Sequence, residues 1–471
     1  MTPPRTICLG FLALIAIGTV LLTLPFSSSN GTWINPLIAL FTATSAVCVT
    51  GLSVVNVGEF YSGFGQFVLV GLVQVGGLGY MTATTFLLLL FGQRFALREK
   101  VALKQTLDAP GLAGVRNLVK SIISVTLIFE LTGVFLLFSI FAPDYGTGKG
   151  LWLAIFHSIN SFNNAGFSLF DNSFTEYITH PFLNAVVSLL VIGGALGYQV
   201  IMEMVLWVRS GEWKRQLMRN RGGRSLQYNP NKGQNKSPNK RKYGRMNFSL
   251  NFKMALTTSL ILWTVGWVGF FLIEMSNPNT FGSLDWSGKI IAAWFQSMTT
   301  RTAGFNTVDM GDLGLPALFF TIGLMFIGAN PGGTGGGIKT TTIRILLSCT
   351  KTVLRGKEEV ICYQRQIPTS LVLKAIAIFI GSLGTVLIAT TLITIANPEI
   401  PFIEVLFESV SAFATVGLSM GITADLAIPS QLVLVVTMYL GRVGVLLLMA
   451  AIVGEPERSL VRYPEENLLV G

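Results

Sequence analysis

One short pattern occurs four times in this chain, and it constrains the fold more than any other feature. The copies are FTATSAVCVTG, FHSINSFNNAG, WFQSMTTRTAG and FESVSAFATVG, which end at Gly51, Gly166, Gly304 and Gly417. Aligned without gaps on that glycine, each copy has a large aromatic residue ten positions before it. Leu or Phe follows the glycine directly, and Ser or Asn comes next. Agreement in one register predicts four copies of a single structural unit.

The apolar segments that precede these glycines are too short to cross a bilayer, because a membrane-spanning helix needs about 20 apolar residues. Each one stands between longer apolar runs, of which there are roughly eight by the length criterion for membrane helices. The composition agrees, with 51% hydrophobic and 12% charged residues. We therefore predict an all-α polytopic membrane protein, in which each glycine ends a re-entrant pore loop between two membrane helices.

The repeats are predicted at 7–91 with the pore loop at Gly51, 117–209 with Gly166, 251–350 with Gly304, and 370–453 with Gly417. The second helices are expected near 64–91, 182–208, 316–350 and 428–453, with only the third one broken. Two crossings and one re-entrant loop give every unit the same orientation. Four parallel helix–pore loop–helix repeats can surround a pseudo-fourfold central pore.

The formal net charge of +10 is concentrated in loops 92–120, 209–253 and 344–374. By the positive-inside rule these loops are cytoplasmic, and the glycine loops open toward the outside. We predict that 210–250 is a basic, flexible cytoplasmic loop and that 454–471 is a cytoplasmic C-terminal tail. Anionic membrane lipids are the expected partner of such loops, rather than nucleic acid. A cytosolic protein partner remains the alternative.

Non-helical backbone at membrane depth must be buried in protein or line a water-filled cavity. Four glycine-ended segments that meet on one axis would present rings of backbone carbonyls, which can replace the hydration shell of an alkali cation. Glycine suits this task because it tolerates positive φ. The tripeptide TVG at 415–417 also matches the start of the TVGYG potassium filter.

With these motifs, the chain resembles the ion-translocating subunits of the Trk/Ktr/HKT superfamily of potassium and sodium transporters, most closely those of the KtrB type, over about residues 7–453. The resemblance implies one pore per chain, a homodimer, and a place in the bacterial inner membrane. It also implies that K+ is bound by backbone carbonyls of Thr50, Gly51, Ala165, Gly166, Ala303, Gly304, Val416 and Gly417. Relatives that prefer sodium carry serine in place of Gly51, so the resemblance implies potassium.

Two further features indicate a gate. Segment 328–342, GANPGGTGGGIKTTT, places Pro331 and a run of glycines inside an expected membrane helix. It is no P-loop, because Ile338 separates the last glycine from the lysine. The resemblance implies an intramembrane loop that obstructs the pore, formed by Gly332, Gly333, Gly335, Gly336, Gly337 and Lys339. Arg442 lies at the centre of the last helix, where an arginine costs about 2.5–3.5 kcal/mol, and the resemblance assigns it to the same barrier.

The expected function is Na+-dependent K+ uptake, with the sodium dependence resting on the resemblance alone. A proton-linked Trk-type transporter and a sodium transporter of the same superfamily remain open. The resemblance implies a KtrA-type cytosolic ring that binds ATP or ADP, since the chain has no nucleotide-binding domain of its own. We expect no cofactor in this chain, only K+ and Na+ as transported or coupling ions. An enzyme is not expected, because we identify no paired intramembrane aspartates, no H-E-x-x-H motif and no G-x-S-x-G motif.

Overall fold

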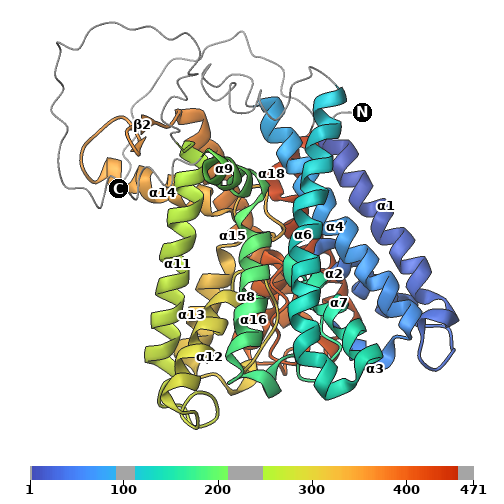
Figure 1. The fold of residues 1–471 in the computed structure, drawn as a ribbon. Coiled ribbons are helices and arrows are strands. Elements are labelled where there is room, and N and C mark those ends of the chain that lie inside the picture. The colour runs from blue at the N-terminus through green and yellow to red at the C-terminus, as the bar shows by residue number, and fades with distance from the viewer. Residues whose placement is uncertain (1–2, 92–111, 211–247, 454–471) are drawn as a thin grey trace, which may run out of the picture.

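The computed structural model describes residues 3–91, 112–210 and 248–453 (Figure 1). Within these ranges the fold is helical apart from one short hairpin. Long helices run side by side, and the shorter helices α2, α7, α12 and α16 lie between them. Most of the predicted basic loop 210–250 and the whole predicted tail 454–471 lie outside the described residues.

Each repeat contains a first helix, a pore helix and a second helix that is broken in three of the four cases. The elements of the first two repeats are α1 (Pro3–Thr23), α2 (Pro36–Cys48), α3 (Val57–Phe60), α4 (Gly63–Phe91), α6 (Leu112–Tyr145), α7 (Thr147–Asn163), α8 (Pro181–Leu196) and α9 (Tyr198–Arg209). Those of the last two are α11 (Leu250–Glu274), α12 (Trp286–Thr299), α13 (Leu315–Phe326), α14 (Thr340–Val353), α15 (Thr369–Ala396), α16 (Phe402–Ala414), α17 (Ile428–Val443) and α18 (Val445–Val453).

A small hairpin lies between the third and fourth repeats. It pairs β1 (Ile361–Cys362) with β2 (Arg365–Gln366) in antiparallel register, with Ile361 opposite Gln366. In Figure 1 the hairpin, α9 and α14 lie at one end of the molecule, whereas α3 lies at the other. The loops that follow the pore helices line cavities at the α3 end, which we call the vestibule face.

Four helices are long and apolar enough to cross a membrane within the described residues: α1, α6 from Val119 onward, α11 and α15. They are the first helices of the four repeats. Two bent pairs, α8 with α9 and α17 with α18, pass the same test when each pair is taken as one span. The protein is therefore a multi-pass membrane protein with four helix–pore loop–helix repeats around a central axis.

The second helices differ from the prediction. Only the third was expected to be broken, but the helix bends by 103° between α8 and α9 and by 92° between α17 and α18. The bends fall on Gly197 (φ 84°, ψ 146°) and Gly444 (φ 88°, ψ 136°), in a region of φ and ψ that is open mainly to glycine. Continuous helices over 182–208 and 428–453 were therefore wrong. The third repeat is interrupted over 327–339, as expected.

The pore helices begin at the vestibule face and end near the central axis. Asn35 caps α2 by accepting a hydrogen bond from the Leu37 amide, and Asp285 caps α12 by accepting one from the Gly288 amide. Hydrogen bonds from the Ser287 hydroxyl and the Gly288 amide lower the pKa of the Asp285 carboxyl. Because the capped ends face the vestibule side, the partly negative C-terminal ends of the helices face the axis.

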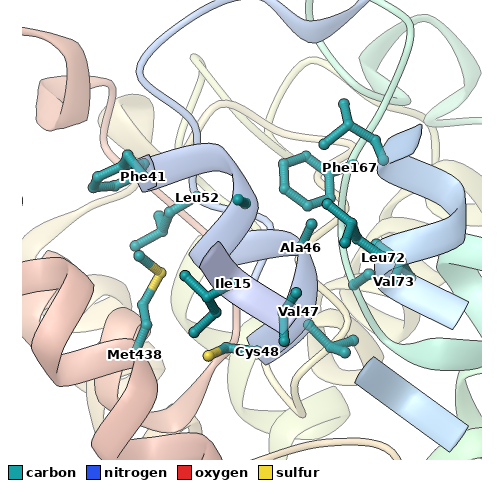
Figure 2. Close-up of a cluster of buried hydrophobic side chains, with 14 of the residues drawn as sticks. Ile15, Phe41, Ala46, Val47, Cys48, Leu52, Leu72, Val73, Phe167 and Met438 are labelled. Carbon is teal, nitrogen blue, oxygen red and sulfur yellow. The ribbon is translucent and has the colours of Figure 1, made fainter. Parts of the chain in front are cut away.

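The pore helix of the first repeat is enclosed by side chains from several elements. Figure 2 shows Ala46, Val47 and Cys48 of α2 beside Leu72 and Val73 of α4. The same view includes Ile15 of α1, Phe167 of the second pore loop and Met438 of α17. All of these side chains are buried in one hydrophobic cluster. Apolar packing from three repeats therefore fixes where this short helix ends.

One close approach recurs between second helix and pore helix. A Cβ added to Gly76, Gly194 or Gly441 would overlap a carbonyl oxygen four residues before the filter-loop glycine, namely that of Val47, Phe162 or Phe413. The matching glycine of the third repeat, Gly328, instead contacts Gly336. The small residues are thus placed where the two helices of a repeat must come closest.

We expect Gly76→Ala to destabilise the protein by about 1–3 kcal/mol, because overpacking forces the helices apart. Gly79→Ala on the same helix is the control, since a Cβ there meets nothing within 4 Å. The measurement is thermal unfolding of the detergent-purified protein, in which Gly76→Ala should lower the midpoint and Gly79→Ala should not. Equal unfolding midpoints for both variants would show that the close approach at Gly76 does not contribute to stability.

Candidate functional site

The four repeated glycines form a closed ring in chain order. A Cβ added to Gly166 would lie 2.9 Å from the carbonyl oxygen of Ala303, and one added to Gly304 would lie 2.5 Å from that of Val416. In the same way Gly51 faces the carbonyl of Ala165, and Gly417 faces that of Thr50. Each glycine thus contacts the residue before the next glycine, and the fourth contact returns to the first repeat. All eight residues predicted for the filter are brought together.

The backbone of each loop has the same unusual conformation. The four glycines have φ between 72° and 94°. The residue two positions before each of them is also left-handed although it is not glycine: Val49 (φ 58°), Asn164 (φ 59°), Thr302 (φ 68°) and Thr415 (φ 51°). Such conformations cost about 1–3 kcal/mol each, and they persist only where the surrounding structure imposes them. The strain is repeated at one position in all four repeats.

The pore helices brace these loops through groups that the sequence analysis missed. The Gly51 amide donates to the Ser45 hydroxyl at 3.0 Å, and the Gly417 amide donates to the Ser411 hydroxyl at 3.1 Å. Both serines lie six positions before their glycine. The ungapped alignment contained a signal for these serines, because a polar residue recurs at this position and the second repeat carries Asn160 there. It was not recognised because serine is common in membrane helices.

A polar vestibule opens on one side of the ring. A cavity of about 290 Å³ is lined by all four glycines and by Ser53, Asn306 and Ser419. It adjoins a cavity of about 520 Å³ lined in part by Asp171, Asp309 and Asp312. Carboxylates beside such an entrance raise the local concentration of cations. Asp309 lines both cavities, whereas Glu59 lines neither of them.

The glycine-rich segment 327–339 lies on the opposite side of the ring. The Gly336 amide donates to the Thr415 hydroxyl at 3.0 Å, and a Cβ on Gly335 would overlap the Thr302 hydroxyl. Thr415 and Thr302 each lie two positions before a ring glycine, on the side away from the vestibule. The segment therefore lies directly against the inner side of the ring, and we call it the inner loop.

The inner loop is also attached to the break in the second repeat. The Thr334 amide donates to the Gly194 carbonyl at 3.1 Å, and the Tyr198 amide donates to the Gly332 carbonyl at 3.2 Å. A Cβ on Gly333 would lie 2.7 Å from the Ala195 oxygen. The bend at Gly197 thus makes room for the loop. This pairing of two broken helices explains why the second repeat could not remain straight.

The predicted gate residues lie together. Arg442 is fully buried, and its guanidinium donates to the Thr334 carbonyl and, at 2.9 Å, to the Gly76 carbonyl. Lys339 donates to the Gly335 carbonyl at 2.6 Å within the loop. Gly332 and Gly337 have positive φ, which permits the tight turns of the loop. Arg442 therefore connects the inner loop to the first repeat, the only repeat with an apolar residue, Val49, two positions before its ring glycine.

A second buried arginine was not predicted. Arg301 lies three positions before Gly304, is 2% exposed, and donates to the Gly328 carbonyl at 3.1 Å. Gly328 lies near the start of the inner loop and pairs with its end, because its amide donates to the Ile338 carbonyl at 2.9 Å. Arg301 thus holds the loop at its base, whereas Arg442 holds it at its centre. The sequence contained a signal for this residue, because Arg301 is a charged residue within the repeated segment WFQSMTTRTAG.

One pentapeptide, GLSMG at 417–421, matches the G-x-S-x-G pattern of hydrolases, so the statement that the sequence lacks this pattern was wrong. The structural context of a nucleophile elbow is a strand–turn–helix unit with a histidine beside the serine. Here the segment follows the pore helix α16, and the Ser419 hydroxyl donates to the Glu408 carboxylate. The geometry therefore does not support acyl-transfer chemistry at Ser419.

Comparisons with known proteins point to one class of proteins. The family profile described as "TrkH: Cation transport protein" matches residues 6–463. The chain is 36% identical to the Ktr system potassium uptake protein B of Bacillus subtilis, over all of this chain and 97% of that protein. It is 38% identical to the protein of the same name from Vibrio alginolyticus, over 99% of this chain and 95% of that one.

Two other similarities extend the comparison. The chain is 33% identical to the potassium/sodium uptake protein NtpJ of Enterococcus hirae, over all of this chain and 98% of that protein. The crystal structure of the potassium transporter TrkH from Vibrio parahaemolyticus superposes with a TM-score of 0.68 at 19% identity. The superposition covers 95% of this chain and 85% of that one, so the two share a fold.

Proposed function

The chain belongs to the TrkH family of cation transport proteins, and on this basis we propose that it is the ion-translocating subunit of a potassium uptake system. The observation that carries the proposal is the closed ring of Gly51, Gly166, Gly304 and Gly417, each beside the carbonyl of the next repeat. A ring that joins a polar vestibule to a blocked inner side is suited to selecting a dehydrated cation.

In this proposal the carbonyl oxygens of the ring glycines and of Thr50, Ala165, Ala303 and Val416 bind K+. Backbone carbonyls replace the hydration shell of the ion without a net charge, so the ion can enter and still leave. The four C-terminal ends of the pore helices add partly negative charge toward the same point. Glycine at position 51 favours potassium over sodium, following the expectation drawn from the resemblance.

The inner loop and Arg442 are proposed as the gate. The loop lies across the inner side of the ring, and a guanidinium in a cation path repels the permeating ion. The hydrogen bonds of Arg442 to the Thr334 and Gly76 carbonyls hold this barrier closed. Opening would require these bonds to break and the loop to move away from Thr302 and Thr415.

The remaining features of the proposal concern orientation and partners. We place the chain in the bacterial inner membrane as a homodimer, with the vestibule face outside and the basic loops in the cytoplasm, where they contact anionic lipids. A cytosolic KtrA-type ring that binds ATP or ADP is proposed to control the gate. The relatives named as parts of a Ktr system support a multi-component transporter. Uptake is proposed to depend on Na+.

Uptake by a potassium-uptake-deficient host tests the function. Cells that express the chain together with a cytosolic nucleotide-binding subunit should take up K+ and Rb+, and external Na+ should increase the rate several-fold. Copurification of that subunit and loss of ATP stimulation in its absence would support the partner. Measurement of K+, Rb+ and Na+ uptake with and without external sodium distinguishes the alternatives.

The outcomes separate the proposal from its two competitors. Uptake of Na+ in preference to K+ would identify a sodium transporter. K+ uptake that ignores Na+ but follows the external proton concentration would identify a proton-linked Trk-type transporter. Full nucleotide-responsive transport by the isolated chain would contradict the proposed regulatory ring.

A further inference from the structure

A glutamate is completely buried behind the vestibule wall of the fourth repeat. Glu408 lies on the pore helix α16, nine positions before Gly417, and is 0% exposed. Its Oε1 accepts hydrogen bonds from the Ser419 hydroxyl and, at 3.1 Å, from the Thr423 hydroxyl. Ser419 and Thr423 both line the cavity that the ring glycines line. The carboxyl group is therefore one hydrogen bond away from the proposed ion path.

The second oxygen of this carboxyl group has no hydrogen-bond partner among the described residues. Oε2 of Glu408 is buried and receives no donor. Burial opposes the ionisation of such a group, whereas the hydrogen bonds that the Ser419 and Thr423 hydroxyls donate to Oε1 favour the ionised form. A buried carboxylate in this state needs a positive charge nearby.

The helices packed against α16 do not supply that charge. They are α13, α15 and α17. Helix α13 has no charged residue, α15 has only Lys374 in its second turn, and α17 has only Arg442 in its last turn on the inner side of the ring. The other acids on α16 and its loop are Glu404 and Asp425, which have the same sign as Glu408. These three helices therefore place no positive charge on the vestibule side of α16, and the buried Arg301 of the third pore loop donates to the Gly328 carbonyl of the inner loop instead.

The corresponding positions of the other repeats show that the fourth is special. Nine positions before the ring glycine they carry Thr42, His157 and Phe295. His157 accepts from the matching serine, because its Nδ1 bonds the Leu153 carbonyl and its Nε2 lies 3.1 Å from the Ser168 hydroxyl. The second and fourth repeats lie diagonally opposite each other in the ring. Of the two buried side chains at this position, His157 and Glu408, only Glu408 is an acid.

We propose that Glu408 is an affinity-determining residue, whose buried carboxylate supplies a fixed negative charge to the cation at the outer mouth of the ring, with the permeating ion as its counter-charge. This rests on the proposed function and deepens it. The ring carbonyls carry no net charge, so they select by size and geometry. Glu408 adds attraction from one side at low dielectric, where Coulomb interactions are weakly screened.

Glu408→Gln tests the charge because the amide keeps the shape and can still accept from Ser419. We expect the KM for K+ uptake into proteoliposomes to rise about tenfold, with Vmax changed less than about twofold, as removal of a ground-state binding interaction requires. Glu404→Gln is the matched control, since it removes a carboxylate of the same sign one turn earlier on α16. Its KM should stay close to that of the unsubstituted protein.

Ser419→Ala separates charge from positioning. It removes the hydrogen bond but leaves the carboxylate, so its KM should rise much less than that of Glu408→Gln. Equal effects of the two substitutions, or an unchanged KM in Glu408→Gln, would overturn the proposal. In all of these variants K+ uptake itself should persist. A complete absence of K+ uptake in the unsubstituted protein would instead refute the proposed function.

A pH profile provides the second measurement if Glu408→Gln does not fold. Acidification from about pH 8 to about pH 5 protonates carboxylates and should raise the KM for K+. The measurement uses the Asp171→Asn, Asp309→Asn, Asp312→Asn triple variant, which removes the carboxylates that line the two vestibule cavities. A KM that still rises on acidification supports Glu408, whereas a flat profile in the triple variant overturns the proposal.

Discussion

Substitution of Gly304 by serine is expected to raise the KM for K+ by about 100-fold, equivalent to about 2.7 kcal/mol of lost ion binding, and to abolish the preference for K+ over Na+. The reason is geometric. A side chain at this position would lie 2.5 Å from the Val416 oxygen and 2.9 Å from the Cα of Gly166, while φ at Gly304 is 78°. The serine must therefore displace backbone atoms of two neighbouring repeats at once.

The measurement is competition between Rb+ and Na+ for uptake by a potassium-uptake-deficient host. Gly323→Ser is the control, because Gly323 lies on α13 with nothing within 4 Å of an added Cβ and without a positive φ. It should leave both affinity and selectivity intact. If the Gly304→Ser form took up K+ with unchanged affinity and selectivity, the ring would not be the filter.

Arg442→Ala is expected to increase the maximal rate of K+ uptake by about tenfold, the change produced by lowering a barrier by 1.4 kcal/mol. The substitution removes the positive charge from the path and the two hydrogen bonds that hold Thr334 to the first repeat. The KM should change little, because the ring carbonyls that we propose to bind K+ are not contacted by Arg442. Initial rates of Rb+ uptake at saturating concentration measure the effect.

Two companion variants make this test specific. Arg442→Lys keeps the charge but cannot reach both carbonyls with the same geometry. Its uptake rate should therefore lie between those of the unsubstituted protein and Arg442→Ala. Deletion of glycines within 332–337 should also raise the rate, since it shortens the inner loop. Because burial makes Arg442→Ala costly for folding, each variant must first elute as a single species in detergent. Unchanged rates in folded Arg442→Ala would remove this residue from the gate.

The repeat architecture could be predicted from the sequence because it is encoded locally. The glycine, the aromatic residue ten positions earlier and the Ser or Asn that follows recur in one register, so Gly51, Gly166, Gly304 and Gly417 were identified without structural information. Their cyclic contacts follow from equal orientation of four units. The break at 327–339 was also local, because Pro331 and its glycines cannot continue a helix.

Features that depend on contacts between repeats could not be predicted. The motif G-x-x-G is continuous helix at Gly76 and Gly79 but ends in a sharp bend at Gly197 and at Gly444, and at Gly197 the bend accompanies the docking of the inner loop on the second repeat. Left-handed backbone at Val49 contradicts the preference of a β-branched residue, and it is imposed by the ring. Glu408 was overlooked because its neighbours Ser419 and Thr423 meet it only after the pore loop turns back.

The ring of four glycines is made by one chain, and this has a consequence for how the protein can change. In a pore assembled from four identical subunits, every substitution appears four times around the axis. Here each substitution alters a single quadrant, as the different residues at 42, 157, 295 and 408 illustrate. Ion preference can therefore change through substitutions in one repeat at a time, and each repeat can acquire a separate function.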